Sequence, residues 1–188
     1  YNQFFDAKIY GSILRLEFID VEIIEEAIKQ LRTSRVEDII AQGYLNFEVP
    51  IIEELVEQYR FLTMRYDIVV TNPPYMGSNG MEAKLSKYVK KFYPNTKSDL
   101  FAVFMDVSSN ITKNYGYYAM INQQSWMFLI SYEKLREVIL KDKTIINMVH
   151  TGARRFREIG GEVVQNKYFI FLNNAINLYN GRYVRIVG

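Results

Sequence analysis

Two stretches near the start of the chain carry apolar residues at helical spacing. In residues 20–32 the apolar side chains recur with the period of an amphipathic helix, and Asp20 stands where an N-cap is expected. Residues 50–64 repeat this pattern, with a proline in the first turn. Residues 35–40 are compatible with a short helical piece between the two. We therefore expect residues 1–65 to form a helical segment that leads into a strand.

From residue 66 onward the pattern changes to short apolar runs that alternate with amphipathic stretches. Residues 67–71 are mostly β-branched and apolar, as in a strand that is buried on both faces. Helices are expected at 98–111 and 131–140, and Ser131 is expected to cap the second. Further strands are expected at 116–122, 144–150, 166–172 and 183–187. This order predicts an α/β fold with a parallel sheet in residues 66–188, whose last strands form an antiparallel hairpin at the sheet edge.

Composition and charge narrow the class of protein. The 188-residue chain can bury a core and contains no cysteine, which excludes disulfides, thiolate nucleophiles and cysteine-based zinc sites. It has no apolar run long enough to cross a membrane, so we expect a cytoplasmic protein. Residues 1–66 carry 12 acidic and 7 basic side chains, whereas residues 67–188 carry 9 acidic and 16 basic. This asymmetry indicates a polyanionic partner for the second part, although solvated surface lysines would give the same count.

The most distinctive chemistry lies in Asn72-Pro73-Pro74-Tyr75, directly after the strand at 67–71. Ligands of open parallel sheets bind beyond the carboxyl ends of the strands. The two prolines restrict the backbone, so the Asn72 side-chain oxygen and the Pro73 carbonyl have fixed directions. Two such acceptors can hold the exocyclic amino group of a nucleobase by its two hydrogens. This favours the pyramidal form of the amine, which frees its lone pair for attack. Tyr75 can stack on the ring of the same base. The alternative is a turn without a catalytic role.

The run DIVVTNPPY, residues 67–75, resembles motif IV of the S-adenosylmethionine-dependent amino methyltransferases, especially the adenine-N6 DNA methyltransferases. Further segments resemble large restriction–modification enzymes and BREX-type, PglX-like phage-defence methyltransferases: residues 10–13, 97–104, 116–126 and 156–165. The resemblance implies the C-terminal part of a Rossmann-like class I methyltransferase sheet. It also implies methyl transfer to a flipped-out adenine of double-stranded DNA, with catalytic roles for Asn72, Pro73, Pro74 and Tyr75. Other defence-system proteins become candidate partners.

The resemblance adds a second group of candidate residues. Phe156 follows a strand and is the candidate for stacking on the second face of the base, with Phe169 as the alternative. The candidates for contacts with DNA phosphates are Lys84, Lys87, Lys90, Lys91, Arg154, Arg155 and Arg157. An amphipathic helix with solvated lysines, or arginines that only increase solubility, would give the same pattern. His150 is the single histidine, and the sequence shows no further metal-ligating residues at a spacing that would complete a metal site with it.

The expected cofactor site is incomplete in this sequence. The family holds S-adenosylmethionine at a glycine-rich turn after its first strand, because only glycine lets the backbone come so close. No such turn is recognisable here, and only Asn72 and Pro73 would touch the edge of the cofactor. We therefore expect the chain to be the later part of a methyltransferase, which alone binds the cofactor weakly or not at all and is inactive.

Other functions stay open at this point. Protein-glutamine N5 methyltransferases also grip an amide nitrogen with Asn-Pro-Pro-Tyr, but the basic balance of residues 67–188 and the downstream resemblance argue against this group. Cytosine-N4 transfer fits less well, because those enzymes more often carry Ser or Asp at the position of Asn72. A non-catalytic DNA-binding or assembly module is the alternative from a different class.

Overall fold

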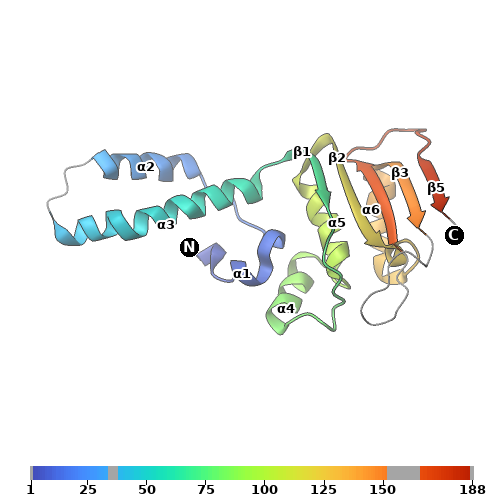
Figure 1. Cartoon of the computed structure of the whole chain (residues 1–188), viewed down its shortest axis with the longest axis horizontal. Coiled ribbons are helices and arrows are strands. Elements are labelled where there is room, and N and C mark those ends of the chain that lie inside the picture. Colours follow the sequence, from blue (N-terminus) through green and yellow to red (C-terminus); the bar gives the residue numbers. More distant parts are fainter. Residues whose placement is uncertain (1, 34–37, 152–165, 187–188) are drawn as a thin grey trace. The chain divides into compact units, whose positions relative to one another are not determined.

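The computed structural model of the chain describes residues 2–33, 38–151 and 166–186 (Figure 1). The chain divides into two compact units, Tyr1–Met64 and Arg65–Gly188. Among the described residues, no helix is both long enough and apolar enough to cross a membrane.

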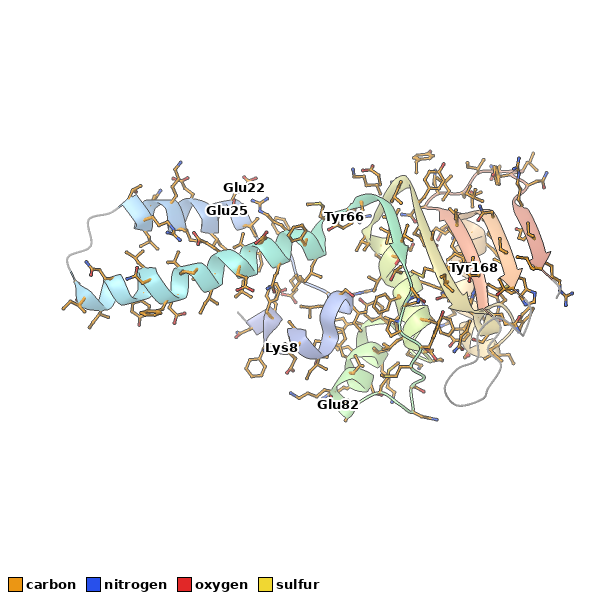
Figure 2. All side chains as sticks on the ribbon, viewed as in Figure 1. Lys8, Glu22, Glu25, Tyr66, Glu82 and Tyr168 are labelled. Atoms are coloured by element: carbon orange, nitrogen blue, oxygen red, sulfur yellow. The ribbon has the colours of Figure 1, made fainter. Side chains whose placement is uncertain are left out.

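The first unit is helical in its described part. It contains two 3₁₀ turns, η1 (Asn2–Phe4) and η2 (Gly11–Ile13), and the helices α1 (Ala7–Tyr10), α2 (Val21–Thr33) and α3 (Ile39–Thr63). The Asp20 carboxylate accepts a hydrogen bond from the Glu22 backbone N–H at 3.2 Å, as expected of a residue that caps α2. Ion pairs join α2 to α3, among them Glu25 (labelled in Figure 2) with Arg60 at 2.7 Å.

Helix α3 is longer than the sequence pattern predicted. We expected a helix that starts at residue 50 and a separate piece at 35–40, but α3 is continuous and Pro50 lies inside it. The helix begins earlier because the Asp38 carboxylate accepts from the Ile40 N–H at 3.2 Å and caps it there. An interior proline costs roughly 3 kcal/mol or more. Burial of Val49, only 4% exposed, next to the proline offsets part of this cost.

The second unit is built on a five-stranded sheet in the order β1-β2-β4-β3-β5. The strands are β1 (Tyr66–Thr71), β2 (Thr112–Gln123), β3 (Thr144–Thr151), β4 (Asn166–Leu172) and β5 (Arg182–Ile186). Strand β1 is parallel to β2, and β3 is parallel to β5, whereas β4 is antiparallel to both β2 and β3. The predicted α/β class and the antiparallel pairing of the 144–150 and 166–172 strands are confirmed.

The predicted place of that antiparallel hairpin is wrong. Strand β4 lies in the interior of the sheet, between β2 and β3, and β5 forms the edge. The physical reason is burial, because Phe169 and Phe171 of β4 are almost fully enclosed in the core with residues of α5 and α6, and a central strand is better covered than an edge strand. Sequence spacing does not reveal which neighbours a strand will have.

The helices of this unit are α4 (Ala83–Phe92), α5 (Leu100–Ile111) and α6 (Glu133–Asp142), with 3₁₀ turns η3 (Gln124–Met127) and η4 (Ile130–Tyr132) before α6. Helices α5 and α6 pack on one face of the sheet, where their apolar side chains form the core with Tyr118, Met120, Phe169 and Phe171 (Figure 1). Ser131 does not cap α6, contrary to expectation. It lies exposed in η4, because burial of Tyr132 extends a 3₁₀ turn to the start of α6.

The opposite face of the sheet carries exposed apolar side chains. On β1, Ile68 is 67% exposed and Val70 is 73% exposed, whereas Val69 packs against the core. The prediction of a strand buried on both faces is therefore wrong for β1 in the described part of this unit. Strand β1 is at the sheet edge, and the core that α5 and α6 form lies on the side of Val69 only.

Candidate active site

The Asn72-Pro73-Pro74-Tyr75 corner follows β1 directly, at the carboxyl end of the parallel strands. Asn72 is exposed, and its side-chain amide makes no hydrogen bond to another described residue. Pro73 is buried, and no described N–H donates to its carbonyl oxygen. Both oxygens thus keep their capacity to accept hydrogen bonds. The corner presents two acceptors on a backbone that the prolines restrict.

The ring of Tyr75 is anchored from two sides. Its Oη donates a hydrogen bond to the Ile121 carbonyl oxygen of β2 at 2.8 Å. The ring also meets Phe101 of α5 edge to face, with centroids 6.3 Å apart and planes at 64°. Tyr75 is half-buried against the core. Its plane is therefore fixed by the sheet and by α5 before any ligand arrives.

The segment after the corner is fastened to the start of α5. The Met76 carbonyl accepts from the Leu100 N–H at 3.0 Å, and the Ser78 N–H donates to the Ser98 carbonyl at 2.9 Å. The Asp99 carboxylate oxygen Oδ1 accepts from the Met76 N–H at 3.0 Å and from the Phe101 N–H at 3.2 Å. Asp99 therefore caps α5 and holds the corner with the same oxygen.

Asp99 lies in the segment 97–104 that resembles the family, but it was not among the predicted site residues. A serine and an aspartate before an apolar helix signal an N-cap, but no local signal indicates the contact with Met76. Burial raises the pKa of Asp99, while the backbone N–H groups of Phe101 and Met76 act in the opposite direction. The negative charge of the carboxylate thus destabilises the fold. Asp99 stabilises the fold through the hydrogen bonds that its oxygen accepts.

The candidate DNA-contacting lysines lie on α4. Lys84, Lys87, Lys90 and Lys91 are all exposed. Val89 on the same helix is fully buried, and the rings of Tyr88 and Phe92 lie 4.6 Å apart. This arrangement is that of an amphipathic helix with its lysines in solvent, and it is equally open to nucleic acid. The role of these lysines stays a prediction.

Of the remaining candidates, the structure describes only Phe169 and His150. Arg154, Arg155, Phe156 and Arg157 lie outside the described residues. Phe169 is only 1% exposed and packs against Trp126 and Phe171, so it has no free face to stack on a base. Among the residues that the structure describes, no group of three or more His, Asp or Glu side chains could hold a metal ion.

Residues 6–156 match the sequence profile of the Eco57I restriction-modification methylase family. Over 98% of its length the chain is 42% identical to the adenine-specific methyltransferase BrxX of Escherichia coli O9:H4 (strain HS). Over 99% of its length it is 48% identical to the adenine-specific methyltransferase PglX of Lacticaseibacillus casei (strain Zhang). The chain spans 15% of the length of each of these relatives.

The fold of the chain is also similar to that of a solved structure. A Listeria monocytogenes protein assigned to the class I S-adenosylmethionine-dependent methyltransferases matches 65% of this chain and 37% of its own, with a TM-score of 0.50 and 13% identity. At this identity the likeness concerns the fold alone. The profile match covers most of the chain and confirms the resemblance seen at residues 67–75. The chain therefore belongs to the Eco57I restriction-modification methylase family.

Proposed function

We propose that this chain is the target-base-binding part of a DNA methyltransferase that acts on adenine N6 in a bacterial restriction–modification or phage-defence system. The observation that carries the proposal is the pair of available acceptors, Asn72 Oδ1 and the Pro73 carbonyl, beside the anchored ring of Tyr75. The names of the two relatives, both adenine-specific methyltransferases, support adenine as the target.

The corner would act on the amino group of the target base. An exocyclic amine is a weak nucleophile, because its lone pair is delocalised into the ring. Acceptance of its two hydrogens by Asn72 and Pro73 favours the pyramidal amine and stabilises the positive charge that develops during attack. Tyr75 would stack on the flipped base, worth about 1–3 kcal/mol. Its anchored plane would set the angle at which the amine meets the methyl donor.

The described residues fit only the edge of a site for S-adenosylmethionine. When bound, this cofactor supplies an electrophilic methyl group from its sulfonium. Asn72 and Pro73 would contact that end of it. Among the described glycines only Gly11 has a positive φ, and it opens a 3₁₀ turn in the first unit, so no described turn offers the cradle that the methionine part needs.

Double-stranded DNA with a flipped adenine is the proposed substrate. The excess of basic side chains in residues 67–188 suits a polyanion, and the exposed lysines of α4 are the described candidates for phosphate contacts. Phe156 remains the candidate for the second face of the base, and the arginines around it for further phosphates.

The test is Asn72→Ala in the full-length polypeptide that carries this chain. We expect adenine methylation to fall roughly 100-fold or more, while the dissociation constant for DNA stays nearly unchanged, because the amide acts on the amine and not on the DNA backbone. The matched control is Asn180→Ala, which removes an exposed amide from the loop between β4 and β5 at the opposite sheet edge. Near-normal methylation by Asn72→Ala, or methyl transfer to protein glutamine instead of DNA, would overturn the proposal.

A further inference from the structure

A lysine lies almost buried at the same end of the sheet as the Asn72–Tyr75 corner, where the parallel strands β1 and β2 have their carboxyl ends. Lys167, next to Tyr168 (labelled in Figure 2), is near the start of β4, opposite Asn122 on β2 and His150 on β3. Because β4 is antiparallel, its first residues meet the carboxyl ends of the parallel strands. Lys167 is only 6% exposed. Its side chain alternates with Tyr168 and so points to the same face as Phe169, toward α5 and α6.

The ammonium of Lys167 lacks a strong partner among the described residues. Its Nζ lies 2.9 Å from the Met127 sulfur and 5.2 Å from the centre of the Phe128 ring. A thioether is a weak acceptor, and an ammonium carries three donors. No described carboxylate forms an ion pair with it. Burial lowers the pKa of Lys167, and the nearby Arg185 lowers it further. The fold therefore leaves donors of a poorly solvated cation unused.

An unpaired acceptor lies directly across from this cation. Asn122 is 0% exposed, and its Oδ1 has no hydrogen-bond partner among the described residues. Its amide nitrogen is 3.7 Å from the Met120 sulfur, another weak contact. Residues opposite each other on antiparallel strands have Cβ atoms about 4.5–5.5 Å apart. The two side chains are thus neighbours on the same face of the sheet, and each keeps unused hydrogen-bonding capacity toward the described residues.

Both groups lie close to the residues that would hold the base. Asn122 follows Ile121, whose carbonyl accepts the hydrogen bond from Tyr75. Lys167 is one strand further, and neighbouring strands are about 4.7–4.9 Å apart. Because the Tyr75 hydroxyl reaches the backbone of β2, a planar base that stacks on Tyr75 would lie next to β2, one strand away from Lys167. The ring nitrogens of adenine are neutral acceptors and fit an ammonium that is shielded from water.

We propose that Lys167 donates a hydrogen bond to a ring nitrogen of the target adenine. This inference rests on the proposed function. A nearly buried lysine suits a flat neutral acceptor better than a hydrated phosphate. If the contact is with N1, Lys167 would also contribute to specificity, since guanine N1 and thymine N3 carry a proton where adenine N1 is an acceptor. Its contribution would lie in binding the flipped base, so its loss should raise KM more than it lowers kcat.

The test compares base analogues in the full-length polypeptide that carries this chain. The substrates are a duplex with adenine at the target position and the same duplex with 1-, 3- or 7-deazaadenine, each of which removes one ring nitrogen. We expect the wild-type protein to lose roughly 10- to 100-fold in kcat/KM on one of the three analogues. Lys167→Met should lose a similar factor on adenine and little more on that same analogue.

Two comparisons keep the outcomes separate. Lys134→Met removes an exposed lysine of α6 and should leave all four substrates unchanged. A wild-type protein that tolerates all three analogues equally would overturn the assignment, whether or not Lys167→Met folds. A loss by Lys167→Met that is the same on every substrate would also overturn it and would indicate a phosphate contact. Methylation of the natural adenine by the wild type tests the proposed function separately, so failure of either idea is recognisable.

Discussion

Asp99 is predicted to hold the candidate active site through its acceptor oxygen. Asp99→Ala removes two hydrogen bonds, from the Met76 N–H at 3.0 Å and from the Phe101 N–H at 3.2 Å. The loss of an N-cap costs about 1 kcal/mol, and a second hydrogen bond contributes about 1 kcal/mol. We therefore expect Asp99→Ala to lower the free energy of unfolding of the second unit by about 2 kcal/mol.

Asp99→Asn separates the acceptor from the charge. Asparagine keeps an oxygen at the position of Oδ1 but carries no charge. Because burial raises the pKa of Asp99, the charged carboxylate is disfavoured in the fold, so its removal should cost little at neutral pH. We expect the free energy of unfolding of Asp99→Asn to lie within about 0.5 kcal/mol of the wild-type value, or above it.

The pH dependence follows from the direction of the same pKa shift. Below the ordinary carboxyl value of 3.8, Asp99 is protonated in both states, and its full contribution to stability is present. This contribution is lost as pH rises through the raised pKa of the folded state, since the folded state then binds more protons than the unfolded one. The stability of the wild type relative to Asp99→Asn should therefore fall from acidic to neutral pH.

Urea unfolding followed by tryptophan fluorescence measures these quantities. Trp126 is the single tryptophan of the chain and is buried in the core of the second unit, so its emission reports that unit. Glu137→Ala, at an exposed position of α6, is the control and should change little. The reasoning is refuted if Asp99→Ala unfolds like the wild type, or if the wild type gains stability over Asp99→Asn as pH rises.

Two further predictions concern the packing around the site. Tyr75→Phe removes the 2.8 Å hydrogen bond to Ile121 and should cost about 1 kcal/mol of stability in the same urea assay, with unchanged stability arguing against the anchoring role. Gly116→Ala would place a Cβ 2.7 Å from the Asp67 carbonyl oxygen and should cost about 1–3 kcal/mol; Gly80→Ala, with no atom nearer than 3.4 Å, is its control, and equal effects of the two would contradict the steric argument.

Elements with a strong local period were predicted well from the sequence. The helix expected at 20–32 is α2, Val21–Thr33, and the strand expected at 166–172 is β4 over the same residues. Predictions of element boundaries from single residues were weaker. Pro50 did not begin a helix and Ser131 did not cap one, because burial of Val49 and Tyr132 outweighed the local preference. Local propensity contributes too little free energy to prevail over packing.

The sequence by itself determined the chemistry of the corner. The order Asn72-Pro73-Pro74-Tyr75 after an apolar strand specifies two acceptors, a restricted backbone and a ring, because these properties depend on covalent structure and on neighbours along the chain. The residue types also predicted the basic character of the second part and the α/β class.

Only the tertiary structure decided what surrounds the corner. It placed β4 between β2 and β3, tied Met76 to Asp99, anchored Tyr75 on Ile121, and brought Lys167 opposite Asn122. The residues in the three pairs, Met76 with Asp99, Tyr75 with Ile121 and Asn122 with Lys167, are between 23 and 46 positions apart in sequence. Their meeting depends on which strands pair and on which faces are buried, and the period of a single strand does not encode either choice. The physical reason is that long-range pairing is decided by the burial of the whole core.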